Sequence, residues 1–535
     1  MGATGTSASA AMDTGASQVV GGARAGGTVV VALAPEPRTL NVLTLEGNIT
    51  SGSYALQPVI TPFSKYNDKA ALIYDVGEGA TLVRSSPLVV TYRIKQAARW
   101  SDNRPVTADD MIFTYRLIMN PDHQIATRAG FEDIRRLQRM NAKTLRVTFK
   151  KPFAAWHSLW GPIYPAHAGG GIAGQDFNQA WRRGPPIANG PFRFVKWDRG
   201  SQIVIERNRS YWGKQPLLSR IVFRFIQDTN TQFQAMRSGE VDIISPDLQR
   251  EIAALRTQPG IATQTGSQFT WEHLDFQLGP HGHPALKKKY VREAFVTAVN
   301  RLQMRQVLYK EVAPDLPALD NVIFKNFQPE YVRHLFQPFG FSQKKAIWLL
   351  RSNGCTGGPA RPSAGNRDIY SCPGVGRLEF GFHSTAGNQQ RELAFQIMQA
   401  QLRSIGIQLN ARFSSSALTL TLATRNWDIM LYAWLGSPDP SGSVNIHRCG
   451  GIQNHQSYCN RPVSRLLLKS NETLDASRRS ALLNEADRLI AWDVVTLPLY
   501  ARPAFLIYKS ELKGAILNPT NTGLTWNAES WSLAG

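Results

Sequence analysis

The sequence predicts an α/β protein of more than one domain, with a largely parallel sheet in its C-terminal half. The chain has 535 residues, more than a single hydrophobic core usually serves. Hydrophobic residues make up 43% and charged residues 19%, a normal globular balance, so most of the chain should fold. From about residue 274 helical and extended patterns alternate, and helices that connect strands are typical of parallel sheets.

The first half contains expected strands and one well-marked helix. Residues 28–33 are β-branched or apolar and follow a Gly pair, so we expect a buried strand there. Thr107 precedes Asp109 and apolar residues at helical spacing, and we expect it to be the N-cap of a helix that ends before Pro121. Further strands are expected at 88–95, 144–149, 203–206, 221–225 and 241–244, with a short helix between 231 and 239.

The second half contains three expected helices. An apolar stripe from Val291 to Leu302 predicts one helix, and 392–405 predicts another, which is closed by Gly406 and followed by a strand at 407–413. A third helix is expected at 480–492, followed by a strand at 495–499. We interpret these stripes as faces that pack against the core.

Four cysteines fall as two pairs that are local in the sequence. The simplest pairing is Cys355–Cys372 and Cys449–Cys459, and the spacings do not match a zinc site. Two disulfides imply an oxidising compartment. The alternative is four free thiols in a cytosolic protein.

The formal charge is +21, but the basic residues are scattered and no nucleic-acid-binding motif is present. We therefore expect a solvated basic surface and no nucleic-acid partner. No run of apolar residues is long enough to span a membrane. Residues 1–25 are rich in Ala, Gly, Ser and Thr, so we expect a flexible tether from which the secretion signal has been removed.

The sequence lacks the common catalytic motifs. There is no nucleophile elbow, phosphate-binding loop or zinc-protease motif. His281 and His283 could hold a metal, but no acidic residue or cysteine follows at ligand spacing. We expect no catalytic residue, no cofactor and no metal. A secreted peptide hydrolase, the alternative of another class, would need a nucleophile with its base or a metal triad.

Seven blocks follow one another in an order that one family shares. They are residues 26–41, 99–110, 189–213, 238–242, 291–295, 427–434 and 497–500. In this order they resemble the large extracellular solute-binding proteins of ABC importers, a group that includes dipeptide, oligopeptide and nickel receptors.

The resemblance implies a two-lobed fold of the periplasmic-binding-protein type (class II, large peptide-receptor type), with an extra subdomain inserted in lobe I. Two crossing strands near 271–276 and 497–501 would form the hinge. The implied segments are a tether (1–25), lobe I (26–50), the inserted subdomain (51–185), lobe I again (186–270), lobe II (271–498) and the C-terminal return of lobe I (499–535).

The resemblance also implies a function. The protein would be a monomer outside the cytoplasm, periplasmic or at the cell surface, and lipid-anchored before removal of its signal. It would capture a small solute such as an oligopeptide and deliver it to the membrane subunits of an ABC permease. It would not be an enzyme.

The ligand is left open between two readings. In the peptide receptors of this family, an Asp three residues after a Trp pairs with the peptide ammonium. Here Ser437 stands at that position after Trp434, and Asp439 follows two residues later. The ligand is either an oligopeptide whose ammonium is held mainly by Asp439, or one without an ammonium, such as a blocked peptide, an oligosaccharide or a metal chelate.

The candidate ligand-binding residues lie in segments that resemble the family's cleft. Arg391 begins an expected helix and could meet a ligand carboxylate. Aromatic faces would suit sugars and peptide side chains alike. The full set is Glu36, Tyr54, Trp271, His273, Phe382, Asn388, Arg391, Tyr432, Trp434, Ser437 and Asp439.

Overall fold

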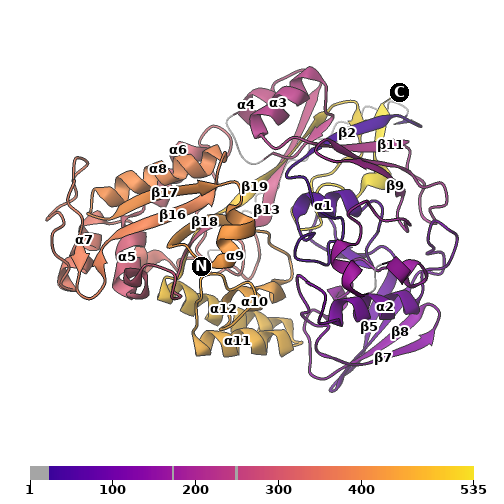
Figure 1. The fold of residues 1–535 in the computed structure, drawn as a ribbon, viewed down its shortest axis with the longest axis horizontal. Coiled ribbons are helices and arrows are strands. Elements are labelled where there is room, and N and C mark those ends of the chain that lie inside the picture. Colours follow the sequence, from indigo (N-terminus) through magenta and orange to yellow (C-terminus); the bar gives the residue numbers. More distant parts are fainter. Residues whose placement is uncertain (1–22, 172–173, 247–250, 535) are drawn as a thin grey trace, which may run out of the picture.

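A single sheet of ten strands runs through both halves of the molecule. The computed structural model describes residues 23–171, 174–246 and 251–534. The strand order is β17-β16-β18-β13-β19-β12-β2-β11-β10-β9. Strands β13 (Ile261–Phe276) and β19 (Thr496–Lys509) are long and antiparallel, and they connect the two halves (Figure 1). We call the half built from residues 23–270 and 499–534 lobe I, and the half built from 271–498 lobe II.

Lobe I contains one end of this sheet. The strand predicted at 28–33 is confirmed as β2, which pairs in parallel with β11 and β12. The other elements of this part are β9 (Phe192–Asp198), β10 (Gln202–Arg207), β11 (Arg220–Phe225), α3 (Thr229–Ser238), β12 (Ile243–Ile244) and α4 (Glu251–Arg256).

Residues 50–149 form a second layer of lobe I around an antiparallel sheet in the order β5-β6-β8-β7. The predicted cap is confirmed: α2 starts after Thr107, whose N–H donates to Asp110 at 2.7 Å. The elements are α1 (Thr50–Leu56), β3 (Ser64–Tyr66), β4 (Leu72–Tyr74), β5 (Gly77–Ser85), β6 (Leu88–Ile94), α2 (Ala108–Met119), β7 (Ile134–Asn141) and β8 (Thr144–Phe149).

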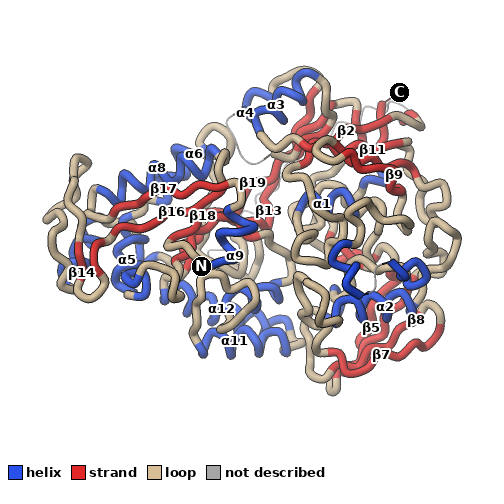
Figure 2. The backbone as a smooth tube through the Cα atoms, viewed as in Figure 1, coloured by secondary structure: helices blue, strands red, loops and turns tan. Residues whose placement is uncertain are grey.

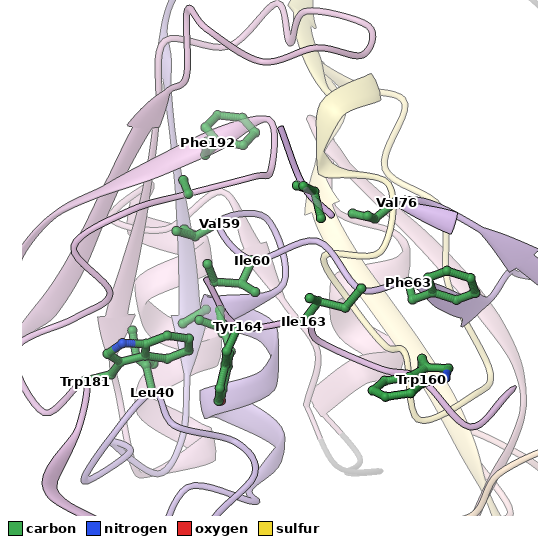
Figure 3. Packing of buried hydrophobic residues seen from close by; sticks show 14 of the residues in the cluster. Leu40, Val59, Ile60, Phe63, Val76, Trp160, Ile163, Tyr164, Trp181 and Phe192 are labelled. Carbon is green, nitrogen blue, oxygen red and sulfur yellow. The ribbon is translucent and has the colours of Figure 1, made fainter. Parts of the chain in front are cut away.

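One continuous hydrophobic core joins this second layer to the ten-stranded sheet. Phe63 comes from the second layer, Trp160 from the segment that follows it in the chain, and Phe192 begins β9 (Figure 3). All three are buried in the same cluster as Val29 and Val31 of β2. Because a close-packed core resists sliding, these parts of lobe I should move as one body.

Lobe II is an α/β unit built on three parallel strands. Strand β16 (Glu379–Thr385) lies between β17 (Gln408–Ser414) and β18 (Ile429–Trp434) and is parallel to both. Helices lie on both sides of these strands (Figure 2). They are α5 (Lys289–Ala298), α6 (Arg301–Tyr309), α7 (Gln343–Ser352), α8 (Gln389–Arg403), α9 (Leu422–Thr424), α10 (Ser443–His447), α11 (Arg461–Glu472) and α12 (Ala476–Asp493).

Two sequence predictions in this lobe were wrong in detail. The stripe from Val291 to Leu302 is not one helix. Helix α5 ends at Ala298, and Asn300 caps the separate helix α6 by accepting the N–H of Gln303 at 3.0 Å. Leu302 is accordingly 52% exposed. The strand expected at 495–499 continues to Lys509, because its outer half pairs with β12 and β13.

Both predicted disulfides, Cys355–Cys372 and Cys449–Cys459, are confirmed. Most of the expected tether lies outside the described residues. At its end, however, Ala23–Arg24 forms strand β1, which pairs with β21 (Ser532–Ala534), so these two residues are not a free linker. In the part of the chain that the structure describes, no helix is long and apolar enough to cross a membrane.

Candidate functional site

The parallel strands of lobe II end together at one edge of the sheet. Strand β16 ends at Thr385, β17 at Ser414 and β18 at Trp434. In open α/β sheets ligands bind outside the carboxyl ends of the strands. We call the segments that follow these ends, residues 385–391, 414–421 and 434–441, the carboxyl edge.

The carboxyl edge meets lobe I. Tyr66, at the end of β3 in lobe I, lies close enough to Ser437 and Asp439 of the edge for both to act on its pKa. Burial, together with the nearby charge of Asp439, raises the pKa of Tyr66 to about 12. Ser437 therefore lies between the lobes, where the sequence placed a ligand contact.

Two further contacts join the lobes beside this edge. The Lys151 ammonium of lobe I lies 3.4 Å from the Glu472 carboxylate at the end of α11. The N–H of Ala154 donates to the carbonyl of Asn471 at 2.6 Å. The lobes thus touch along their facing surfaces as well as through the hinge strands.

Asp439 is paired within its own lobe, which was not predicted. Its two oxygens accept from Arg479 Nη1 and Nη2 at 3.0 and 2.9 Å, and the Ser441 N–H donates at 2.8 Å. Burial opposes ionisation, but the hydrogen bonds and charge of Arg479 hold the pKa of Asp439 below its usual value. The expectation that Asp439 is the main anchor for an ammonium stays a prediction, and the structure adds that a guanidinium already pairs with this carboxylate.

Arg391 is also paired with the chain itself. It is buried and donates to Glu272 Oε1 and Oε2 at 3.1 and 3.3 Å and to Thr385 Oγ1 at 2.9 Å. Arg502 on β19 donates to the same Glu272 at 2.7 Å. Although burial opposes it, the two guanidinium charges hold the pKa of Glu272 at about 2. The expected contact of Arg391 with a ligand carboxylate is thus made with a carboxylate of the protein.

Four rings stack beneath the carboxyl edge. The centroid of His273 lies 4.3 Å from that of Trp271 and 6.3 Å from that of Trp434, and Trp434 lies 5.9 Å from His455. His273 is fully buried, and neither ring nitrogen has a hydrogen-bond partner among the described residues. Trp434 and His455 are the partly exposed members of this stack, and Trp434, which belongs to the edge, is a ring that a ligand could touch.

Buried hydroxyls fix the strands under this stack. Tyr432 donates to Asp275 Oδ2 at 2.7 Å and Thr496 donates to Oδ1 at 2.6 Å. Tyr432 is 2% exposed, so it supports the edge from below. Its ring lies 5.4 Å from that of Trp434, centroid to centroid.

The other candidates lie elsewhere or have structural tasks. Phe382 is in the hydrophobic core with Phe395 and does not reach the surface. Asn388 accepts the N–H of Arg391 at 3.1 Å and caps α8 at the edge. Glu36 of lobe I accepts from Trp197 Nε1 at 2.8 Å. Burial raises the pKa of Tyr54, also in lobe I, to about 12.

Sequence reasoning missed three residues of this region: Tyr66, Arg479 and Arg502. Arg479 comes 40 residues after Asp439, and Tyr66 comes from a short strand of the other lobe. No local spacing marks such pairs. Arg502 directly follows the expected hinge strand 497–501, and this position was the one available signal.

The fold and the edge define a two-lobed solute-binding protein. The model of the family described as "Bacterial extracellular solute-binding proteins, family 5 Middle" matches residues 81–454. That is more than half of the chain, and the protein belongs to this family. The resemblance read from the seven sequence blocks is confirmed, and so is the predicted fold class.

Relatives and solved structures cover nearly the whole chain. The oligopeptide-binding protein OppA of Mycobacterium tuberculosis (strain ATCC 25618 / H37Rv) is 24% identical over 499 residues, covering 91% of this chain and 82% of OppA. The oligopeptide-binding protein AppA of Bacillus subtilis (strain 168) is 24% identical over 549 residues, covering 99% and 95%. The structure of the periplasmic EDTA-binding protein EppA has a TM-score of 0.87 at 24% identity, covering 97% of this chain and 98% of EppA. The structure of Bacillus subtilis AppA with a nonapeptide has a TM-score of 0.83 at 21% identity, covering 96% and 100%.

Proposed function

We propose that the protein is the substrate-binding protein of an ABC importer, which captures an oligopeptide or a similar solute between its lobes and delivers it to the membrane permease. The observation that carries the proposal is the carboxyl edge of β16, β17 and β18, which faces lobe I. The relatives OppA and AppA, named as oligopeptide-binding proteins, support a peptide as the ligand. These relatives are binding proteins, and we propose no catalytic activity for this chain.

Bending of the two shared strands would open and close the site. The pairing of β13 with β19 shifts register between Ser267 and Trp271 and again between Glu272 and His273. Such irregularities interrupt the ladder and bend a strand, and hinge closure around a ligand is a known mode of motion. We therefore propose the hinge at residues 267–273 of β13 and the facing residues 498–503 of β19.

The proposal also covers the compartment in which the protein works and its oligomeric state. Two disulfides suit an oxidising compartment outside the cytoplasm. We propose that the protein works there as a monomer, held near its permease by a lipid anchor.

Small-angle scattering tests the capture. With an equimolar library of tri- to nonapeptides at saturation, the radius of gyration should fall or the distribution of conformations should narrow towards the closed form. Isothermal calorimetry on the same mixture should show heat of binding. A protein that takes up no peptide, by calorimetry or by native mass spectrometry, would contradict the proposed function.

A further inference from the structure

The charge of Asp439 is already neutralised where the loop after β18 meets lobe I. Arg479 donates to both carboxylate oxygens, and the side chains of the pair are only 11% and 14% exposed. A ligand ammonium here would add a third charge to a buried pair. If it displaced Arg479 instead, it would leave a guanidinium without its counter-ion. Both arrangements cost free energy, because buried charge needs compensation.

Two further carboxylates on β13, under the same edge, are also satisfied. Glu272 is shared between two guanidinium groups, those of Arg391 and Arg502. Asp275 is buried and accepts from the hydroxyls of Tyr432 and Thr496. An incoming cation would have to compete with these partners for either carboxylate.

The carboxyl edge instead exposes aliphatic, aromatic and hydroxyl groups. Leu418 and Leu420 follow β17 and are 45% and 62% exposed, and Leu435 follows β18 and is 51% exposed. Trp434 and Ser437 lie beside them, each partly exposed. Such groups bind apolar side chains and uncharged hydrogen-bonding groups of a ligand.

Glu472, beside this edge, is paired with Lys151 of lobe I at 3.4 Å. Glu392, in the first turn of α8, is a further carboxylate to consider here. Its Oε1 accepts the N–H of Gly387 at 3.0 Å. The positive end of the helix dipole favours a negative charge at that place. Glu392 therefore has a capping task of its own.

We propose that the ligand presents no free ammonium to lobe II. It is a peptide with a blocked N-terminus, held at the carboxyl edge through apolar side chains and neutral hydrogen-bonding groups. This inference rests on the proposed function, because it takes a peptide to be the captured solute. The Asp439–Arg479 pair then shapes the edge and does not bind the ligand.

Matched libraries test the proposal without any mutation. The protein is incubated with equimolar tri- to nonapeptides and, separately, with the same peptides after N-acetylation, and the bound species are identified by native mass spectrometry. The acetylated peptides should bind at least as tightly as the free amines in calorimetry. Free amines that bind roughly tenfold tighter, the ~1.4 kcal/mol of a modest charged contact, would overturn the inference and leave the proposed function standing. If neither library binds, the proposed function fails and the inference fails with it.

Variants that remove charge test whether a carboxylate of lobe II binds a ligand ammonium after all. The double variant Asp439→Asn/Arg479→Gln removes both charges together and should change the affinity for the acetylated peptides less than about threefold. Glu485→Gln/Arg488→Gln is the matched control, because it removes an exposed ion pair from α12, the helix that carries Arg479. A loss of roughly tenfold for free-amine peptides in Asp439→Asn alone, or in Glu392→Gln, with melting temperatures unchanged, would overturn the proposal.

Discussion

The ion pairs of the candidate site join residues that are far apart in the sequence. Asp439 and Arg479 are 40 residues apart, and Glu272 and Arg391 are 119 residues apart. Partners this distant meet only when the sheet and its helices have formed. Their positions at strand and helix ends could therefore be predicted, whereas their pairing could not.

The buried Glu272 makes stability depend on pH. Its pKa is about 2 in the folded protein against a usual 4.5, so the folded state favours the ionised form. A depressed carboxyl pKa stabilises the fold fully above pH ~4.5, and this contribution is lost as pH falls towards 2. The shift corresponds to ~3 kcal/mol. In urea unfolding experiments on the wild type, the free energy of unfolding should fall between pH 5 and 2 by an amount of this order.

The variant Glu272→Gln isolates this effect. It should be clearly less stable than the wild type at neutral pH, because it leaves Arg391 and Arg502 without their shared counter-ion. The difference should shrink at acid pH, where the wild-type carboxyl group is protonated. Glu485→Gln, in an exposed ion pair, serves as the control, and its effect should stay within about 0.5 kcal/mol at every pH. A pH-independent difference for Glu272→Gln would contradict the assignment.

At the scale of elements, local signals were reliable where the structure depends on local contacts. The N-cap at Thr107, the strand at 28–33 and the two disulfides were all visible in the sequence. The break at Asn300 is an exception, because its cap is local and was still missed. The length of β19 was not visible, because it depends on tertiary partners. The outer half of β19 is a strand because β12 and β13 lie on either side of it.

The two disulfides should stabilise lobe II unequally. Cys355–Cys372 closes the longer loop, with a sequence separation of 17 against 10 for Cys449–Cys459. In the loop-closure picture each contributes ~2–4 kcal/mol, and the longer loop gains ~0.5 kcal/mol more. Replacing each pair by Ala and measuring the free energy of unfolding in urea checks this order. If removal of either pair left stability unchanged, the loop-closure account would be wrong for that disulfide.

At the scale of the whole molecule, the ten-stranded sheet both joins the lobes and allows them to move. One hydrophobic core packs lobe I with its second layer, while another continues from lobe II under α3 and α4. The lobes are thus continuous at the top of Figure 1, where α3 and α4 lie, and touch through polar contacts near the carboxyl edge. This asymmetry favours bending at the irregular part of β13 and β19 over separation of the lobes.

The contact between Lys151 and Glu472 offers a way to shift this motion without touching the carboxyl edge. Lys151 lies 3.4 Å from Glu472 of lobe II and 3.5 Å from Asp133 of its own lobe, and its side chain is partly exposed. In Lys151→Glu this attraction becomes a repulsion between the lobes, and an exposed pair of this kind is worth ~0.2–1 kcal/mol. The ligand-free protein should therefore become more open, with a larger radius of gyration in small-angle scattering. Peptide affinity should fall by up to about fivefold, because more of the binding energy is spent on closure.

The effect should weaken at high salt, since exposed charges are screened. Lys150→Glu is the matched control, because Lys150 donates to a carbonyl of lobe I. If the two variants gave the same radius of gyration and affinity at every salt concentration, the Lys151–Glu472 contact would have no part in closure.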